Sequence, residues 1–333
     1  MLRRSLLAAV AALAMSATAA LAADDKPAIV FDIGGKFDKS FNESMFNGSE
    51  KFKKETGIAY GEFEIANEAQ REQAIRNFAD QGYSPIIAAG FAQAAALEKV
   101  AKEYPDLKFA IVDMVVDLPN VQSIVFKEEE GSYLVGLLAG MASKSGKVGF
   151  VGGMDIPLIR KFGCGYAQGV KAAKADATVI QNMTGDTGAA WNDPVKGGEI
   201  TKGQMAQGAD VIYAAAGATG LGVLQAAADG GALSIGVDAN QNYLHPGKVL
   251  TSMLKRVDVA VFNVMMSGKD GSFTPGIKVL GLAEDGVGYA VDDNNKPLLT
   301  PEMTAAAEKA RADIIAGTIK VHDYTTDNTC PVQ

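Results

Sequence analysis

Nine residues that suit contact with a ligand follow the carboxyl ends of predicted strands. They comprise aromatic rings, carboxylates, an amide, a lysine and a glycine: Asp38, Phe41, Asn42, Phe91, Asp113, Trp191, Gly217, Asp238 and Lys255. In open parallel sheets, ligands bind beyond the carboxyl ends of the strands. The sequence therefore predicts a ligand site built from residues that are far apart along the chain.

These residue types suit a flat ring that carries hydroxyl groups. Aromatic side chains can hold a heterocycle by its faces, each contact adding about 0.5–1.5 kcal/mol beyond its area term. Asn42 can both donate and accept at the edge of a base, whereas ionised Asp113 and Asp238 only accept and so suit ribose hydroxyls. Lys255 would donate to the ligand and balance the negative charge.

Each of these residues also has a purely structural alternative. A lone aromatic residue such as Trp191 can belong to a hydrophobic core, and an Asp before a helix, such as Asp38 or Asp193, is commonly its N-cap. The other carboxylates can close turns, and Lys255 can be an exposed charge. Their shared position at strand ends is what favours a site.

Motifs of common catalytic sites are absent from the sequence, which contains no G-x-S-x-G, P-loop or H-E-x-x-H pattern. The glycine run from Gly217 to Gly222 offers an anion cradle as an alternative, but no acidic partner for a dinucleotide follows it. The two histidines, His245 and His322, show no metal-ligand spacing. We expect a binding protein with no cofactor and no metal, and not an enzyme.

The N-terminal segment predicts export. Arg3 and Arg4 precede an apolar run that is too short to span a bilayer, and Ala20-Leu21-Ala22 ends the layout of a cleaved secretory signal. The alternative is an amphipathic helix that the mature protein retains. No cysteine lies near the cleavage site, so we expect residues 1–22 to be a signal peptide and the mature protein to be periplasmic, without a lipid anchor.

Removing residues 1–22 leaves about 310 residues, enough for two domains. The formal net charge falls from −8 to −10 because two arginines leave, which disfavours a nucleic-acid partner. The only cysteines are Cys164 and Cys330, which either form one disulfide that ties the C-terminal tail to the body or stay unpaired.

Short apolar strands alternate with amphipathic helices along the chain, a pattern that indicates βαβ units and parallel sheets. We predict an α/β fold of two doubly wound parallel-sheet lobes joined by a hinge. The N-terminal lobe spans 23–145 with a return segment near 256–290. The C-terminal lobe spans 146–255 with a tail near 291–333, in which we expect a strand pair around Asp292–Asn295 and a last helix at 301–316.

Six motifs occur in one order over nearly the whole mature chain: 38–42, 129–133, 146–153, 191–194, 236–238 and 251–258. They resemble the basic membrane protein family of ABC transporter substrate-binding proteins, which is related to purine nucleoside receptor lipoproteins. The resemblance implies a type I periplasmic-binding fold that closes about a hinge. It also implies a nucleoside held between aromatic rings.

The same resemblance implies a role for individual residues. Phe41 and Trp191 would stack on the base, and Asp38 and Asn42 would contact its edge. The ribose would be held by Asp113, Asp238 and Lys255, with Gly217 close by. The sequence departs from the family pattern at Trp191, where phenylalanine is frequent, and after Asp238, where a second acidic residue is common.

We therefore predict a periplasmic receptor for a purine nucleoside or purine base that delivers its ligand to ABC permease subunits in the inner membrane. We expect it to be a monomer that binds no nucleic acid. The alternatives are an exported enzyme such as a nucleoside hydrolase, a receptor for another flat heterocycle such as a flavin, and a ligand sensor that docks onto a signalling partner.

Overall fold

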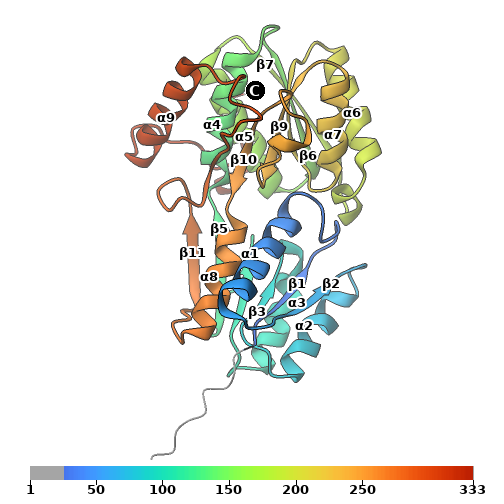
Figure 1. Cartoon of the computed structure of the whole chain (residues 1–333), viewed down its shortest axis with the longest axis vertical. Helices are drawn as coiled ribbons and strands as arrows, with labels where there is room; N and C mark the ends of the chain where they lie inside the picture. The colour runs from blue at the N-terminus through green and yellow to red at the C-terminus, as the bar shows by residue number, and fades with distance from the viewer. Residues whose placement is uncertain (1–25, 333) are drawn as a thin grey trace, which may run out of the picture.

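Two α/β lobes, one above the other in Figure 1, make up this computed structural model, which describes residues 26–332. Each lobe has a six-stranded sheet with helices on both faces. This arrangement confirms the predicted pair of doubly wound lobes. The predicted signal peptide, residues 1–22, lies outside the described residues. Within residues 26–332, no helix combines the length and the apolar character needed to cross a bilayer.

The first lobe carries a wholly parallel sheet in the order β11-β5-β4-β3-β1-β2. Its elements are β1 (Ala28–Phe31), α1 (Phe41–Thr56), β2 (Gly61–Glu64), α2 (Gln70–Asp80), β3 (Ile86–Ala88), η1 (Phe91–Gln93), α3 (Ala94–Glu103), β4 (Phe109–Val112), β5 (Val121–Phe126), α8 (Val257–Lys269) and β11 (Gly276–Leu280).

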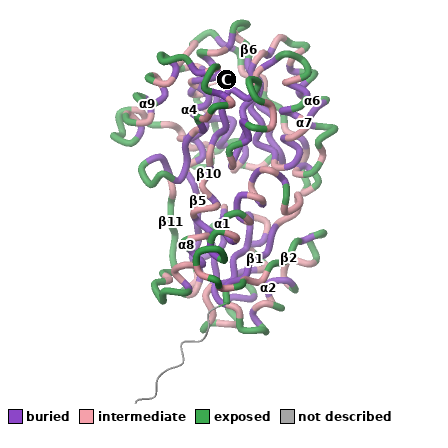
Figure 2. Tube along the Cα trace, viewed as in Figure 1, coloured by how far each residue is buried: buried purple, intermediate pink, exposed green. Residues whose placement is uncertain are grey.

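Strand β1 shows why these segments are unbroken apolar runs. Ile29 and Phe31 belong to the core beneath α1 and α8, whereas Ala28 and Val30 belong to the core beneath α2 and α3. Because successive side chains point to opposite faces and both faces are covered, every position of the strand is apolar. Figure 2 shows the buried segments running through the middle of each lobe.

The second lobe carries the sheet β12-β10-β9-β8-β6-β7, parallel except for β12, which is antiparallel to β10. Its elements are α4 (Glu128–Ala142), β6 (Lys147–Met154), α5 (Pro157–Ala173), β7 (Thr178–Gly185), η2 (Gly188–Trp191), α6 (Pro194–Ala206), β8 (Val211–Ala215), α7 (Thr219–Asp229), β9 (Leu233–Asp238), η3 (Asn242–Leu244), β10 (Val249–Lys255), β12 (Val287–Tyr289), α9 (Pro301–Ile315) and η4 (Tyr324–Thr326).

The chain passes between the lobes three times. The crossings follow Phe126 at the end of β5, Lys255 at the end of β10 and Leu280 at the end of β11. The first crossing therefore precedes α4, and the predicted lobe boundary at residue 145 falls one helix too late. Helix α4 belongs with the second sheet because it packs closely against α5 and also contacts β10, β12 and α9.

The C-terminal tail returns to the second lobe. A disulfide between Cys164 in α5 and Cys330 joins the tail to the body, which is the first of the two states that the sequence left open. The strand pair expected around Asp292–Asn295 is wrong. These residues form a turn instead, in which the Asp292 carboxylate accepts from the backbone N–H of Asn294 at 2.7 Å and from the side chain of Asn240 at 2.7 Å.

Candidate functional site

A cavity lies between the two lobes, at the carboxyl ends of strands from both sheets. Its volume is about 640 Å³, including the part that is open to solvent. All nine residues that the sequence singled out line this cavity, so the structure brings together side chains from both lobes.

Aromatic rings enter the cavity wall from each lobe. Phe41 begins α1 and Phe91 begins η1 in the first lobe, and Trp191 ends η2 in the second. The Trp191 ring lies directly on the strand at Gly153, where a Cβ atom would be 2.2 Å from its Cζ3. Gly217, with φ +56°, passes the same residue, and a Cβ there would lie 3.4 Å from the Trp191 carbonyl oxygen. The two glycines, which have no side chain, therefore leave room for the indole ring of Trp191.

Asp38 is fully engaged with the start of α1. Its Oδ1 accepts from the backbone N–H groups of Ser40 at 2.8 Å and Glu43 at 3.1 Å, and its Oδ2 accepts from that of Asn42 at 3.0 Å. Burial raises the pKa of Asp38 to about 7, against the effect of these three donors. The N-cap residue of α1 is Ser40, but the Asp38 side chain accepts the N–H groups of the first turn. Asp38 thereby orients the helix turn that carries Phe41 and Asn42.

Asn42 presents an unsatisfied acceptor. Its amide nitrogen donates to the carbonyl oxygens of Asp32 and Gly35, both at 3.3 Å. Its Oδ1 is buried and has no hydrogen-bond partner among the described residues. A buried acceptor without a partner is costly, so this atom favours a ligand that donates to it.

Asp32 is a cavity residue that the sequence reasoning missed. It directly follows β1, and its Oδ1 accepts from the Ile33 N–H at 2.8 Å and from Arg71 at 3.2 Å. Its Oδ2 lies 3.0 Å from the position of a Cβ at Gly90, whose φ is +96°. Burial raises the pKa of this carboxyl group. The signal that could have found Asp32 is its place immediately after an apolar strand, the same place that Asp113 has.

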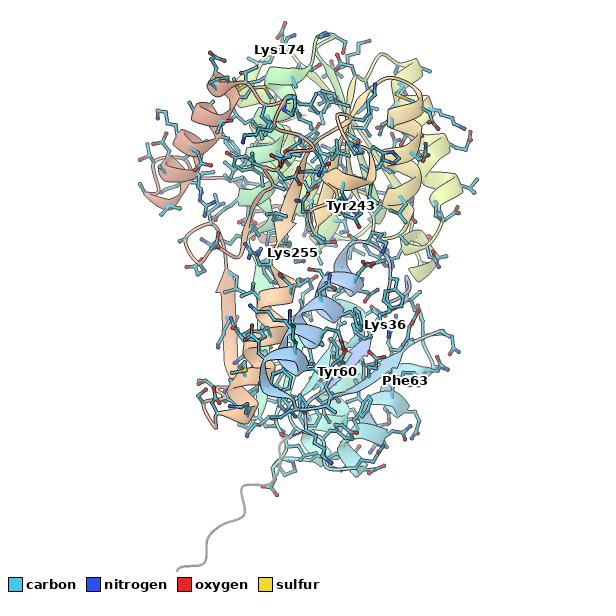
Figure 3. The ribbon with its side chains drawn as sticks, in the orientation of Figure 1. Lys36, Tyr60, Phe63, Lys174, Tyr243 and Lys255 are labelled. Atoms are coloured by element: carbon cyan, nitrogen blue, oxygen red, sulfur yellow. A yellow bond between two sulfur atoms is a disulfide. The ribbon has the colours of Figure 1, made fainter. Side chains whose placement is uncertain are left out.

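Lys255 lines the cavity where the two lobes meet, and Figure 3 labels it at their junction. Its side chain is 2% exposed, and its Nζ lies 2.7 Å from Asp113 and 2.9 Å from Glu128. Burial alone would lower the pKa of Lys255, but these carboxylates hold it above its ordinary value. Burial also raises the pKa of Asp113 to about 6, although Lys255 opposes the shift.

Asp238 makes a second bridge between the lobes. Its Oδ2 accepts from the Ser40 hydroxyl at 2.5 Å, and nearby Gln241 donates to the Lys39 carbonyl oxygen at 2.9 Å. Asp238 and Asp113 have φ values of 64° and 70°, in the left-handed region. Non-glycine residues in this region are uncommon and cluster at functional sites.

Part of the apolar wall comes from Leu158, Ile159 and Phe162 on the first turns of α5. Apolar residues at helical spacing are the usual signature of a core face, so the sequence held no signal for them. Asp193, by contrast, is a helix cap and does not line the cavity, since its side chain accepts from the Lys196 N–H at 2.9 Å.

The site thus combines flat apolar surfaces from both lobes with carboxylate and amide oxygens, plus a single buried ammonium group among its lining residues. Such a set can bind a flat ring whose substituents are mainly hydrogen-bond donors.

Comparisons with known proteins identify similar chains. A family model described as "ABC transporter substrate-binding protein PnrA-like" matches residues 26–325. An ABC transporter nucleoside-binding protein of Lactococcus lactis is 34% identical over 324 residues, covering 90% of this chain and 89% of the relative. An uncharacterized lipoprotein of Pyrococcus horikoshii is 36% identical over 276 residues, covering 79% and 68%.

Among solved structures, an ABC transporter solute-binding protein from Aeropyrum pernix K1 superimposes with a TM-score of 0.82 at 29% identity. The match covers 90% of this chain and 93% of that one, so both lobes and their connections are shared.

Proposed function

The chain belongs to the basic membrane protein family of PnrA-like ABC transporter substrate-binding proteins, with the type I periplasmic-binding fold, and we propose that its interlobe cavity binds a purine nucleoside or purine base. One observation carries the proposal. Phe41 and Trp191 line the same cavity from opposite lobes, and the polar atoms around them are mainly acceptors.

The base lies between the two aromatic side chains in this proposal. Stacking on Phe41 and Trp191 would use the flat faces of the purine, while its edge would donate to the free Oδ1 of Asn42. Asp32 would add a second acceptor at that edge. Asp38, whose oxygens accept backbone N–H groups, would act by fixing the start of α1, with Phe91 as a further apolar wall.

The ribose, when present, lies toward the hinge. Asp113 and Asp238 would accept from its hydroxyl groups, and Gly217 would leave room beside Trp191. Lys255 donates a hydrogen bond to Asp113 and forms an ion pair with Glu128 at 2.9 Å. An ammonium group has three donors, so Lys255 would also donate to the ligand.

The wider role is uptake. We propose that the protein is exported to the periplasm by cleavage after residue 22, acts as a monomer and passes its ligand to ABC permease subunits without changing it. The expected absence of a lipid anchor stays a prediction, because a relative from Pyrococcus horikoshii is named a lipoprotein. Separating the lobes about the three crossings would release the ligand.

Isothermal titration of ligand-free protein with inosine, adenosine and hypoxanthine tests the proposal. We expect one binding site with a dissociation constant in the micromolar range or below, which needs only about −8 kcal/mol. Trp191→Ala and Asp238→Ala should each weaken binding at least tenfold. Phe63→Ala, which removes a half-exposed aromatic from edge strand β2, should leave affinity unchanged.

Three results would contradict this function. Equal affinities for wild type, Trp191→Ala and Asp238→Ala would show that the ligand binds elsewhere. Release of free base from inosine during incubation would show that the protein is a hydrolase. Binding of riboflavin in preference to all purines would show that the ligand is a flavin and not a purine, and the stacking roles of Phe41 and Trp191 would still stand.

A further inference from the structure

Buried charges continue from Lys255 away from the cavity. Glu128, at the start of α4, is 1% exposed and places one carboxylate oxygen 2.9 Å from Lys255 and the other 2.9 Å from Lys161 of α5. The Lys161 ammonium also donates to the carbonyl oxygen of Phe126 at 2.8 Å. Phe126 ends β5 and Lys255 ends β10, and the first two crossings between the lobes directly follow these residues. Lys161, Lys255 and Glu128 therefore lie at the hinge.

The C-terminal tail reaches the same cluster. Asp323 lies 3.7 Å from the Lys161 ammonium and is partly exposed. The tail is fixed there by the Cys164–Cys330 disulfide and by Gln168, whose side chain accepts from the His322 N–H at 2.8 Å and donates to the His322 carbonyl oxygen at 3.0 Å. Every one of these anchors lies on α5, the helix that carries Lys161.

We propose that Lys161 and the tail carboxylate Asp323 are positioning residues for the ligand, because they hold Glu128 midway between the two hinge lysines and thereby fix the Lys255 ammonium against Asp113. The inference rests on the proposed function, in which Lys255 and Asp113 contact the ligand. It extends the site from the cavity to the disulfide-bound tail.

The balance of charges explains why the position of Lys255 depends on Lys161. Lys161 lies 2.9 Å from Glu128 and 3.3 Å from Glu129, so it compensates the charge of Glu128, the carboxylate that also contacts Lys255. In a poorly screened interior, an uncompensated carboxylate attracts the nearest cation strongly. Without Lys161, Glu128 would draw the Lys255 ammonium away from Asp113 and from the ligand.

Lys161→Met tests the inference, because methionine has a similar length and carries no charge. We expect at least a tenfold loss of inosine affinity by calorimetry. Arg160→Met is the matched control, since Arg160 is the preceding residue of α5 and its ion pair is with the exposed Asp155, at 2.6 and 2.7 Å, rather than with Glu128. Its affinity should stay within twofold of wild type.

A second pair of variants, both in the C-terminal tail, tests the inference if Lys161→Met fails to fold. Asp323→Asn removes the tail carboxylate and leaves the disulfide in place, and we expect a two- to fivefold loss of affinity. Asp327→Asn is its control, because Asp327 lies in the same tail and pairs with His322 at 3.1 Å, away from Lys161. Its affinity should equal that of wild type.

The pH profile of affinity separates positioning from a general structural role. The charged groups that act on Asp113 are Lys255, Glu128 and Asp238, and Glu128 is one of those that raise the pKa of Asp113 to about 6. Wild-type affinity should therefore fall as the pH drops through about 6. In Glu128→Gln this fall should move to lower pH, whereas mere loosening of the fold would weaken binding equally at every pH.

The inference and the proposed function fail in different ways. If wild type binds inosine and both Lys161→Met and Asp323→Asn match it, the positioning role is overturned and the function stands. If wild type binds no purine ligand, both are overturned.

Discussion

Buried carboxyl groups dominate the site at the scale of single residues. Asp113 directly follows β4 and Asp238 ends β9, both have backbone in the left-handed region, and both side chains are almost inaccessible to solvent. Neither feature helps the fold by itself, since burial disfavours a charge and the backbone conformation is uncommon. Residues that break local rules in this way mark places where function outweighs stability.

These carboxyl groups predict an unusual dependence of stability on pH. Burial raises the pKa of Asp113 to about 6 and the pKa values of Asp38 and Glu129 to about 7, all above the values of an unfolded chain. These groups therefore bind protons more tightly in the folded protein than in the unfolded chain. Their protonation adds to the free energy of unfolding, fully below about pH 4, and this contribution is lost as the pH rises through about 7.

Urea unfolding of the ligand-free protein measures this effect. We expect the free energy of unfolding to be higher at pH 5.5 than at pH 8, by at least about 1 kcal/mol, given about 1.4 kcal/mol per unit of pKa difference. Asp113→Asn is the control and should reduce the difference. A protein that is equally stable or less stable at pH 5.5 would contradict the account.

The sequence predicted the polar residues of the site better than the apolar ones. Asp113, Asp238 and Lys255 could be found because charged residues after apolar strands stand out, and all three line the cavity. Leu158 could not be found, because an apolar residue on a helix has the same appearance in a core and in a pocket wall. The ligand-binding role of every one of these residues stays a prediction.

At the scale of elements, the order of strands and helices followed from local patterns, but the hinge did not. The polar turn at residues 143–147 is a strong local signal, whereas the true first crossing after Phe126 has no turn composition. What places α4 in the second lobe is distant contact with α5. A Cβ at Gly136 would lie 2.2 Å from the Tyr166 carbonyl oxygen, and one at Gly169 would lie 2.0 Å from that of Tyr133.

Helices α6 and α7 show the same dependence on glycine and offer a test. A Cβ at Gly222 in α7 would lie 1.8 Å from the Pro194 carbonyl oxygen in α6, so close packing explains a glycine run that could have been taken for an anion cradle. We expect Gly222→Ala to lower the free energy of unfolding by about 1–3 kcal/mol, because the helices must move apart.

Gly203 in α6 is the matched control, because a Cβ there would meet nothing within 4 Å. We expect Gly203→Ala to raise the free energy of unfolding by up to about 1 kcal/mol through helix propensity alone. Urea denaturation of the two variants measures both changes. Equal effects of the two substitutions would show that α6 and α7 are not in close contact.

At the scale of the whole molecule, the lobes lie closed on each other. The bonds from Ser40 to Asp238 and from Gln241 to Lys39 cross the cleft, as does the ion pair between Lys255 and Asp113. A ligand that fills the cavity would add contacts to both lobes only in this closed arrangement, and so would favour it over an open one. That linkage is what a transport receptor needs in order to signal to a permease that it is loaded.

The most direct test of the central claim is to identify what the protein carries. Protein purified without added ligand is denatured, and the released small molecule is analysed by mass spectrometry. We predict a purine nucleoside or a purine base, at no more than one per chain. A nucleoside would support ribose contacts by Asp113, Asp238 and Lys255, whereas a free base would support the stacking residues alone. A non-aromatic ligand such as a sugar would leave the fold unchanged and contradict the proposed site.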